Sequence, residues 1–226
     1  MIKRVFDPRG RLAAVHNGIL PMTLRRSLFA LAIALAALPA LAQSKGDFTV
    51  GIGAHQVDPR SDNGALAGGT LPLHIGSDVR PTFTGEYFIA DGLGIEVLAA
   101  LPFEHAIDVT GVGNVGSTKH LPPTVSIQYH FNSGGKVSPL IGVGLNYTTF
   151  FQEDTAGALA GTRLELDDSW GAAVHAGVDF RIGTRDSIRV DARWIDIDTD
   201  VSVDGAHMGT AEIDPLVYGL SWVRTF

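Results

Sequence analysis

The side chains best suited to chemistry in this sequence are three histidines that alternate onto one face of separate extended segments, His55, His130 and His175. A histidine beside a carboxylate can activate a serine as a nucleophile, and Ser126 and Ser169 are the candidates. The sequence has no His-Glu-x-x-His motif and no close histidine pair that would bind zinc. We therefore expect the histidines to fill a polar interior, and we expect neither an enzyme nor a cofactor or metal.

A glycine motif occurs at Gly111, Gly113 and Gly116, which match the G-x-G-x-x-G of dinucleotide-binding proteins. Such a site needs a strand before the motif and a helix after it. Residues 117–120 (STKH) and two prolines follow here, and they do not favour a helix. We therefore expect a flexible external loop rather than a nucleotide site.

An acidic run at 196–200 (DIDTD) resembles the start of a calcium-binding loop. The sixth position of that loop must be glycine and the twelfth glutamate, but Val201 and His207 stand there. The pattern excludes an EF-hand and leaves only an incidental cation on the surface as a hypothesis.

These residues lie on or between segments in which apolar side chains alternate with polar or small ones, the pattern typical of strands. Eight such segments occur, near 48–55, 82–89, 95–102, 124–131, 141–148, 169–180, 188–194 and 216–226. Short turn sequences at about 91, 133 and 184 alternate with polar stretches at 58–78, 104–119, 152–166 and 200–210, which we expect to be long loops. Short turns at one end and long loops at the other are typical of outer-membrane barrels.

Period two alone does not say which face of the barrel is apolar, because a lipocalin-like soluble barrel shows the same alternation. The more polar face here is rich in glycine and carries charges of both signs, which suit a narrow interior. Lysine, common on soluble exteriors, is almost absent from the strands, and aromatic residues gather near strand ends as in an interfacial girdle. We therefore predict an all-β fold, an eight-stranded antiparallel transmembrane β-barrel with its apolar face toward outer-membrane lipids.

The N-terminal region has the layout of a secretory signal peptide at 22–42. A basic head (MTLRR) precedes an apolar run, and a small-x-small site ends at Ala42, directly before Gln43. Residues 1–21 contain prolines and glycines and fit no part of a signal, so we interpret them as a start-site error. The barrel is then residues 43–226. The absence of cysteine is compatible with export through an oxidising compartment, and a net charge of −7 argues against nucleic acid as a partner.

The sequence resembles the OmpW family. The resemblance is carried by 93–103 (LGIEVLAALPF), 120–124 (HLPPT), 139–151 (PLIGVGLNYTTFF), 168–173 (DSWGAA), 196–199 (DIDT), 213–215 (IDP) and the final Phe226. It implies a barrel in the outer membrane of a Gram-negative bacterium that passes small hydrophobic molecules through a narrow, rather apolar channel. Leu98, Ala100 and Leu140 would line that channel. An aromatic last residue, here Phe226, is commonly read by the barrel-assembly machinery.

One residue departs from what the resemblance implies. Arg193 occupies a lumen position where the family tends to carry a bulky apolar group, and it could pair with Glu96 or Asp191 to form a charged plug. A filled lumen would favour a different role, because a small eight-stranded barrel is just wide enough for side chains to occupy it. The alternative is a non-transporting barrel that acts through its external loops, as a structural or adhesion protein or a phage or bacteriocin receptor.

Overall fold

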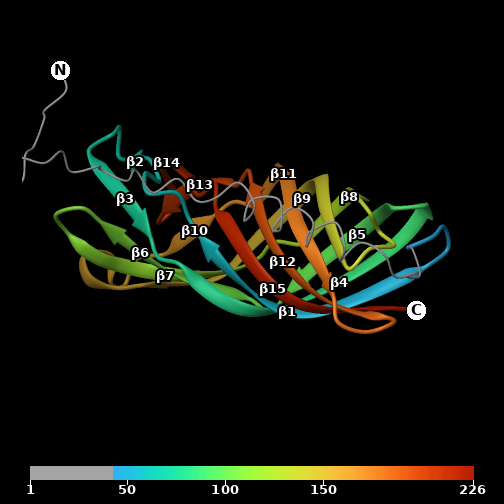
Figure 1. Cartoon of the computed structure of the whole chain (residues 1–226). Helices are drawn as coiled ribbons and strands as arrows, with labels where there is room; N and C mark the ends of the chain where they lie inside the picture. The colour runs from blue at the N-terminus through green and yellow to red at the C-terminus, as the bar shows by residue number, and fades with distance from the viewer. Residues whose placement is uncertain (1–42) are drawn as a thin grey trace, which may run out of the picture. The chain divides into compact units, whose positions relative to one another are not determined.

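The computed structural model describes residues 43–226, which form strands and one turn of 3-10 helix (Figure 1). The predicted start-site error, the signal peptide and Ala42 lie outside the described residues. Within the described part of the chain, no helix is long and apolar enough to cross a membrane. The elements are β1 (Phe48–Asp58), β2 (Ala65–Leu66), β3 (Leu71–Ile75), β4 (Asp78–Ala90), β5 (Leu93–Ala100), β6 (Phe103–Val109), β7 (Gly113–Leu121), β8 (Thr124–His130), β9 (Val137–Thr155), η1 (Gly157–Leu159), β10 (Leu164–Leu166), β11 (Ser169–Arg181), β12 (Asp186–Ile195), β13 (Asp198–Val203), β14 (Ala206–Glu212) and β15 (Leu216–Thr225).

Eight of these strands form a closed antiparallel barrel, in the order β1, β4, β5, β8, β9, β11, β12, β15 and back to β1. The first and last strands meet, with Ile52 opposite Trp222, and the last residue continues the contact through a hydrogen bond from the Phe226 N–H to the Phe48 carbonyl (2.8 Å). The eight predicted strands and the three predicted short turns are confirmed.

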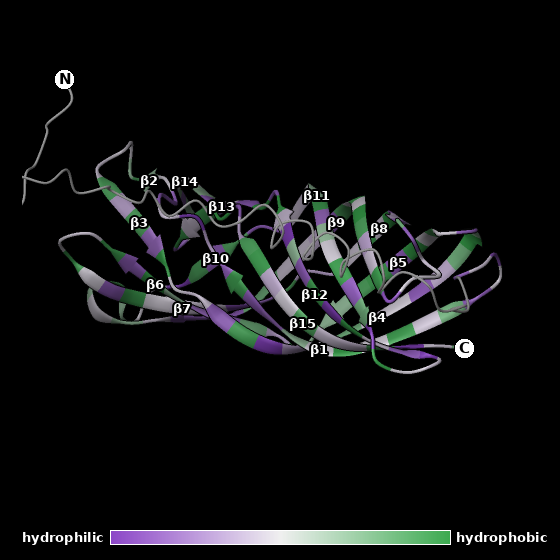
Figure 2. Cartoon of the chain, in the orientation of Figure 1, coloured by the Kyte–Doolittle hydropathy of each residue, from purple (hydrophilic) through white to green (hydrophobic). Residues whose placement is uncertain are grey.

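Apolar and polar residues alternate along the barrel strands (Figure 2), and their exposure assigns them to two different faces of the wall. On the outside, Leu145 and Leu220 are 64% and 60% exposed, whereas Glu96 and Arg193 on the inside are 1% and 2% exposed. Apolar side chains directed outward would be unfavourable in water and are favourable in lipid. The lipocalin-like alternative, which needs an apolar inside, is therefore wrong.

The four predicted long connections between barrel strands are present, but they are built of strands rather than irregular loops. They contain β2 and β3, most of β6 and β7, the end of β9 with β10, and β13 with β14, which we call the second tier. The physical reason is visible in β3, where Leu71, Leu73 and Ile75 alternate with polar or exposed residues and turn toward a shared interior. β9 is 19 residues long and belongs to both parts, because it pairs with β8 and β11 in the barrel and then with β7.

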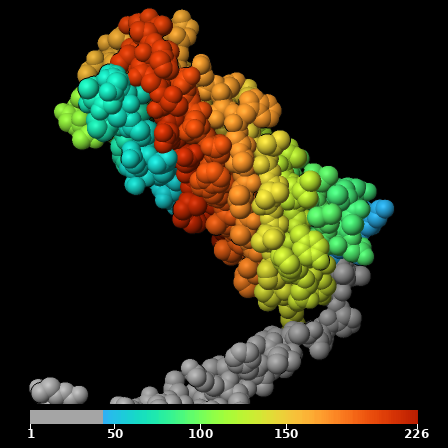
Figure 3. Space-filling view, turned by 90° about the horizontal axis from the view of Figure 1, so that it is seen from above, coloured from blue at the N-terminus to red at the C-terminus, as the bar shows by residue number. Residues whose placement is uncertain are grey.

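Backbone hydrogen bonds close the second tier between segments far apart in sequence. The Ala67 N–H donates to the Met208 carbonyl (2.7 Å), which ties β2 to β14, and Figure 3 shows these cyan and red segments side by side. Gly111 and Gly113, with φ of 80° and 96°, form the tip of the β6–β7 hairpin. The prediction of a flexible loop at 111–116 is therefore wrong, since most of that motif lies in or beside paired strands.

Candidate functional site

The barrel lumen is filled by a network of charged and polar side chains, which we call the lumen network. Its members are all 5% exposed or less and come from six of the eight barrel strands: His55, Glu86, Glu96, Gln128, His130, His175, Asp179, Arg189, Asp191 and Arg193. Burial of this many ionisable groups is tolerated only when each has partners, because an unpaired ion in a low-dielectric interior is very costly.

Two arginines of β12 organise the network around one carboxylate. Arg193 donates to Glu96 Oε1 (2.7 Å) and to Asp191 Oδ2 (3.2 Å). Arg189 donates to Glu96 Oε2 (2.7 Å) and to both oxygens of Asp179 (2.7 and 3.0 Å). The structure thus brings Glu96, Asp191 and Arg193 together, which is the ion pairing that the sequence analysis considered for Arg193. Sequence reasoning missed Arg189, although it shares the parity of Asp191 and Arg193 along the strand.

The three lumen histidines bind network members rather than serines. The Nε2 atoms of His55 and His175 lie 3.3 and 3.1 Å from Asp191 Oδ2, and His130 Nε2 lies 2.9 Å from Glu86 Oε1. The remaining hydrogen-bond partners of these rings are Thr82 and Gln128. Neither Ser126 nor Ser169 is a partner of any of them within residues 43–226, so no Ser–His–Asp arrangement forms there.

Glycines on the neighbouring strands make room for the network. A Cβ on Gly219 would lie 2.1 Å from His55 Nε2 and 2.5 Å from Asp191 Oδ1, and a Cβ on Gly94 would lie 2.1 Å from Glu86 Oε1. These distances are far inside van der Waals contact. The glycine-rich face is therefore what allows such large polar side chains to share an eight-stranded lumen.

A cavity of about 260 Å³ occupies the second tier, which we call the tier cavity. All but three of its lining residues are apolar: Leu66, Leu71, Leu73, Ile75, His105, Ile107, Val109, Val112, Val115, Thr118, His120, Phe150, Ala158, Leu159, Leu164, Leu166, Val201, Val203, Met208, Ala211 and Ile213. Sequence reasoning missed this cavity entirely because it lies between segments expected to be loops. The signal was present as the period-two alternation of leucine, isoleucine and valine in those segments.

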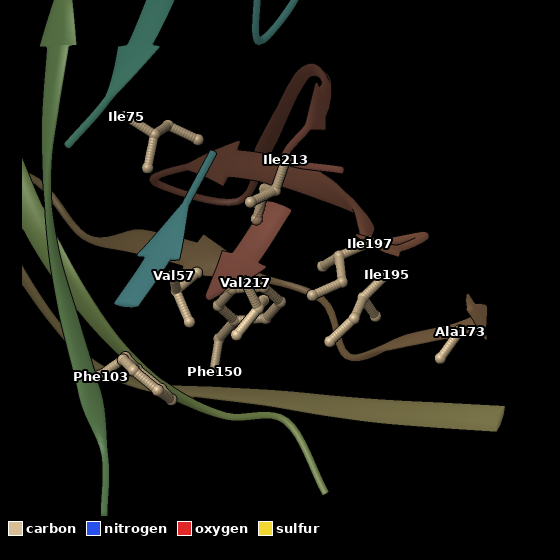
Figure 4. Close-up of a cluster of buried hydrophobic side chains, with 9 residues drawn as sticks. All are labelled: Val57, Ile75, Phe103, Phe150, Ala173, Ile195, Ile197, Ile213 and Val217. Atoms are coloured by element: carbon tan, nitrogen blue, oxygen red, sulfur yellow. The ribbon is translucent and has the colours of Figure 1, made fainter. Parts of the chain in front are cut away.

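An apolar cluster, drawn in Figure 4, shares Ile75, Phe150 and Ile213 with the wall of the tier cavity. It consists of Val57, Ile75, Phe103, Phe150, Ala173, Ile195, Ile197, Ile213 and Val217. Next to it is a small space of about 10 Å³ lined in part by Leu98 and Ala100, together with His55 of the network. Leu140 lines neither cavity, because its register beside His130 places it nearer the short-turn end. Two of the three predicted channel residues thus meet, and the third is separated from them.

Two histidines in the wall of the tier cavity face each other, although the sequence has no closely spaced histidine pair. Their Nε2 atoms are 2.9 Å apart, although His105 and His120 are 15 residues apart in sequence. The β6–β7 hairpin, which sequence reasoning expected to be a loop, brings them together. Burial lowers the pKa of both imidazoles, that of His120 to about 3, so both rings are neutral at neutral pH.

The acidic run contributes to a carboxylate cluster in which ligand atoms of Asp196, Asp198 and Asp214 lie within 4.8 Å of one another. Burial, followed by the charge of Asp214, raises the pKa of Asp198. Asp214 already accepts a hydrogen bond from the Ile197 N–H (3.2 Å) and pairs with Arg60 (3.1 Å). An incidental cation at this cluster stays a prediction.

The sequence model of the OmpW family matches residues 44–226. The chain belongs to the OmpW family. Outer membrane protein W of Vibrio cholerae is 35% identical to this OmpW-family chain, covering 82% of it and 91% of its own length. The crystal structure of OprG from Pseudomonas aeruginosa superposes with a TM-score of 0.71 at 32% identity, covering 82% and 98% of the two chains.

A more distant relative is the dibenzothiophene metabolism operon protein PahQ of Pseudomonas aeruginosa, 27% identical over 64% of this chain and 70% of its own. Membership in the OmpW family confirms the predicted resemblance and the barrel fold. It also places the chain in the outer membrane of a Gram-negative bacterium.

Proposed function

We propose that this protein takes up small hydrophobic molecules at the second tier and passes them across the outer membrane. The tier cavity carries the proposal, because its wall is almost wholly apolar and encloses about 260 Å³. Apolar molecules gain free energy on leaving water for such a surface. The name of PahQ, which links that relative to the metabolism of dibenzothiophene, an apolar aromatic compound, supports the same class of solute.

The lumen network bears on whether ions and water could cross the barrel together with an apolar solute. Its ion pairs fill the barrel below the apolar cluster, where Glu96 joins Arg189 and Arg193. A water-filled pore of the porin kind needs an open, polar lumen, which this network does not provide. The proposal therefore predicts uptake of apolar solutes without a matching ion conductance.

Uptake of a radiolabelled alkane by cells that express the chain, with planar-bilayer conductance of the purified protein, tests the proposal. Leu73→Asp places a charge in the tier cavity and should reduce uptake about tenfold or more, because an unpaired ion is costly in an apolar wall. His74→Asp adds the same charge on the exposed face of the same strand and should leave uptake unchanged. Equal uptake by cells with and without the protein would overturn the proposal.

A second function, a non-transporting barrel that acts through its external surface, is favoured by the filled lumen. It predicts no uptake and no conductance in a correctly folded protein. Heat-shifted gel mobility of each variant shows that the barrel is folded, so that loss of uptake in Leu73→Asp is not confused with loss of the barrel.

A further inference from the structure

The second tier is strongly acidic, although the cavity inside it is apolar. Residues 58–80, 104–119, 152–168 and 196–214 form the tier and its junctions with the barrel, and they contain 16 carboxylates and four cationic side chains. Their formal charge is therefore −12. The short-turn end has the opposite excess, with five cations and three carboxylates: Lys45, Lys136, Arg181, Arg185 and Arg224, and Asp47, Asp91 and Asp186. Negative charge is thus concentrated in the second tier.

Four of these carboxylates lie directly beside the wall of the tier cavity. We call them the carboxylate shell: Asp108, Glu165, Asp200 and Glu212. Each is exposed or half-buried and is the immediate neighbour of an apolar residue that lines the cavity. Asp108, for example, lies between Ile107 and Val109 on β6. Because successive side chains of a strand point to opposite faces, the same strands carry an apolar wall inside and negative charge outside.

The cationic side chains of the second tier offer an anionic solute little compensation. Three of the four are already in ion pairs with carboxylates of the tier: Arg60 with Glu212 (2.7 Å), Arg80 with Asp78 (2.6 Å) and Arg163 with Glu165 (2.5 Å). The fourth, Lys119, donates to Gln152 Oε1 (2.9 Å) and lies opposite Glu104 in the β6–β7 pair. Among the residues that line the tier cavity, none is a lysine or an arginine.

The tier cavity reaches solvent where two of its wall residues, Val112 (50% exposed) and Ala158, are exposed. An ionised solute leaves its charged group at that rim, since an ion in the apolar wall would be unpaired and costly. Charges of one sign around a low-dielectric cleft produce a potential of several kT and change the local concentration of charged ligands. The excess of carboxylates makes this potential negative, so it repels a carboxylate group and attracts an ammonium group.

We propose that the second tier selects hydrophobic solutes by charge, and that its carboxylates exclude anionic amphiphiles such as fatty-acid carboxylates while neutral molecules of the same chain length enter. This inference rests on the proposed function and narrows its solute class. An apolar cavity alone would disfavour cations and anions alike, because burial of an unpaired ion of either sign is costly. Discrimination between the two signs is the property that the carboxylate shell adds.

The test compares octanoate, octanol and octylammonium, which share an eight-carbon chain and differ in the charge of the head group. Equilibrium dialysis measures binding of each radiolabelled compound at neutral pH to the full-length protein in phosphatidylcholine nanodiscs, with protein-free nanodiscs as background. At about 10 mM salt, where charges act over about 30 Å, octylammonium should bind about tenfold more tightly than octanoate, with octanol between them. At about 1 M salt, where the range is about 3 Å, the ratio of the two ions should approach one.

A charge-neutralised variant assigns the effect to the carboxylate shell. It combines four substitutions that change shape little: Asp108→Asn, Glu165→Gln, Asp200→Asn and Glu212→Gln. At low salt, octanoate should bind this variant severalfold more tightly than it binds the parent, because four negative charges near the cavity are gone. Octanol binding should stay the same, since a neutral head group does not respond to the potential.

The matched control removes carboxylates from the short-turn end instead, through Asp47→Asn, Asp91→Asn and Asp186→Asn, and should retain the discrimination. Heat-shifted gel mobility shows that each variant barrel is folded. Equal binding of octylammonium and octanoate at low salt, or a ratio that the four shell substitutions leave unchanged, would overturn the inference and leave the proposed function standing when octanol binds. Failure of all three compounds to bind the parent would contradict the proposed function as well.

Discussion

Strand β9 belongs to both the barrel and the second tier, but the interiors of these two parts are built from opposite kinds of side chain. The lumen buries four carboxylates and two guanidinium groups in fixed mutual contacts, whereas the tier cavity is enclosed mainly by aliphatic side chains. Ion pairs demand a particular geometry from every member, and an apolar wall demands only that its occupant avoid water. The comparison teaches that the barrel fills its own interior with side chains, while the second tier leaves space for another molecule.

Removing the shared carboxylate should break the first half of that comparison most severely. Glu96→Leu leaves Arg189 and Arg193 buried without the partner that they share, so the free energy of unfolding should fall by about 3–5 kcal/mol. Urea unfolding in lipid vesicles measures it. Glu104→Gln removes an exposed carboxylate 3.7 Å from Arg80 and should change little. A Glu96→Leu barrel as stable as the parent would show that the network contributes no stability.

Crowding the lumen should have a smaller effect. Gly219→Ala places a methyl group 2.1 Å from His55 Nε2, and relief of that clash should cost about 1–3 kcal/mol of stability. Gly76→Ala in the second tier is the matched control, since its Cβ would approach nothing closer than 3.8 Å. The same unfolding assay compares the two. Similar losses in both variants would contradict the view that the lumen is the tightly packed region.

Acid should weaken the second tier through its buried histidines. His120 has a pKa of about 3 when buried and 6.5 when free, so below pH 6.5 an opened tier binds protons that the closed tier does not. Stability of the tier therefore rises with pH between about 3 and 6.5. At pH 5 hydrogen-exchange protection of β6 and β7 should be about 25-fold lower than at pH 7. His120→Phe should flatten this dependence, and an unchanged slope in that variant would assign it to other groups.

Breaking an exposed ion pair should have the smallest effect and sharpens the contrast with the lumen. Arg60 contacts Glu212 (2.7 Å) and Asp214 (3.1 Å), but its side chain is 41% exposed. Water already solvates these charges, so Arg60→Gln should change the free energy of unfolding by less than about 1 kcal/mol. A loss as large as that of Glu96→Leu would mean that exposure does not distinguish the two kinds of ion pair.

The barrel could be predicted because its signal is local and repeated. Strand alternation, turn sequences such as Asp91-Gly92 and the placement of glycine on one face each point to the same fold. The second tier could not be separated from loops by the same reading. Its strands are short, from two to nine residues apart from the shared β9, and polar residues interrupt them, so its pairing depends on partners distant in the chain such as Ala67 and Met208.

The candidate sites divide in the same way. Parity along β12 brings Asp191 and Arg193 to one face, so their meeting with Glu96 inside a barrel follows from sequence. The pair of His105 and His120 does not, because it depends on the register of a hairpin and on two rings that lie diagonally across it. Spacing in sequence says little about such contacts when neither strand has been recognised.

The shared strand β9 also determines where this chain can change in length. Leu140 faces the barrel lumen and Phe150 the cluster below the tier cavity, both on the same side of one unbroken strand. Inserting or deleting a single residue between them would turn every later side chain to the opposite face. The hairpin tips at Gly111 and Gly205 are exposed, and an added residue there does not turn the side chains of the flanking strands to the other face. Insertions and peptide tags should therefore be accepted at those tips and rejected within β9.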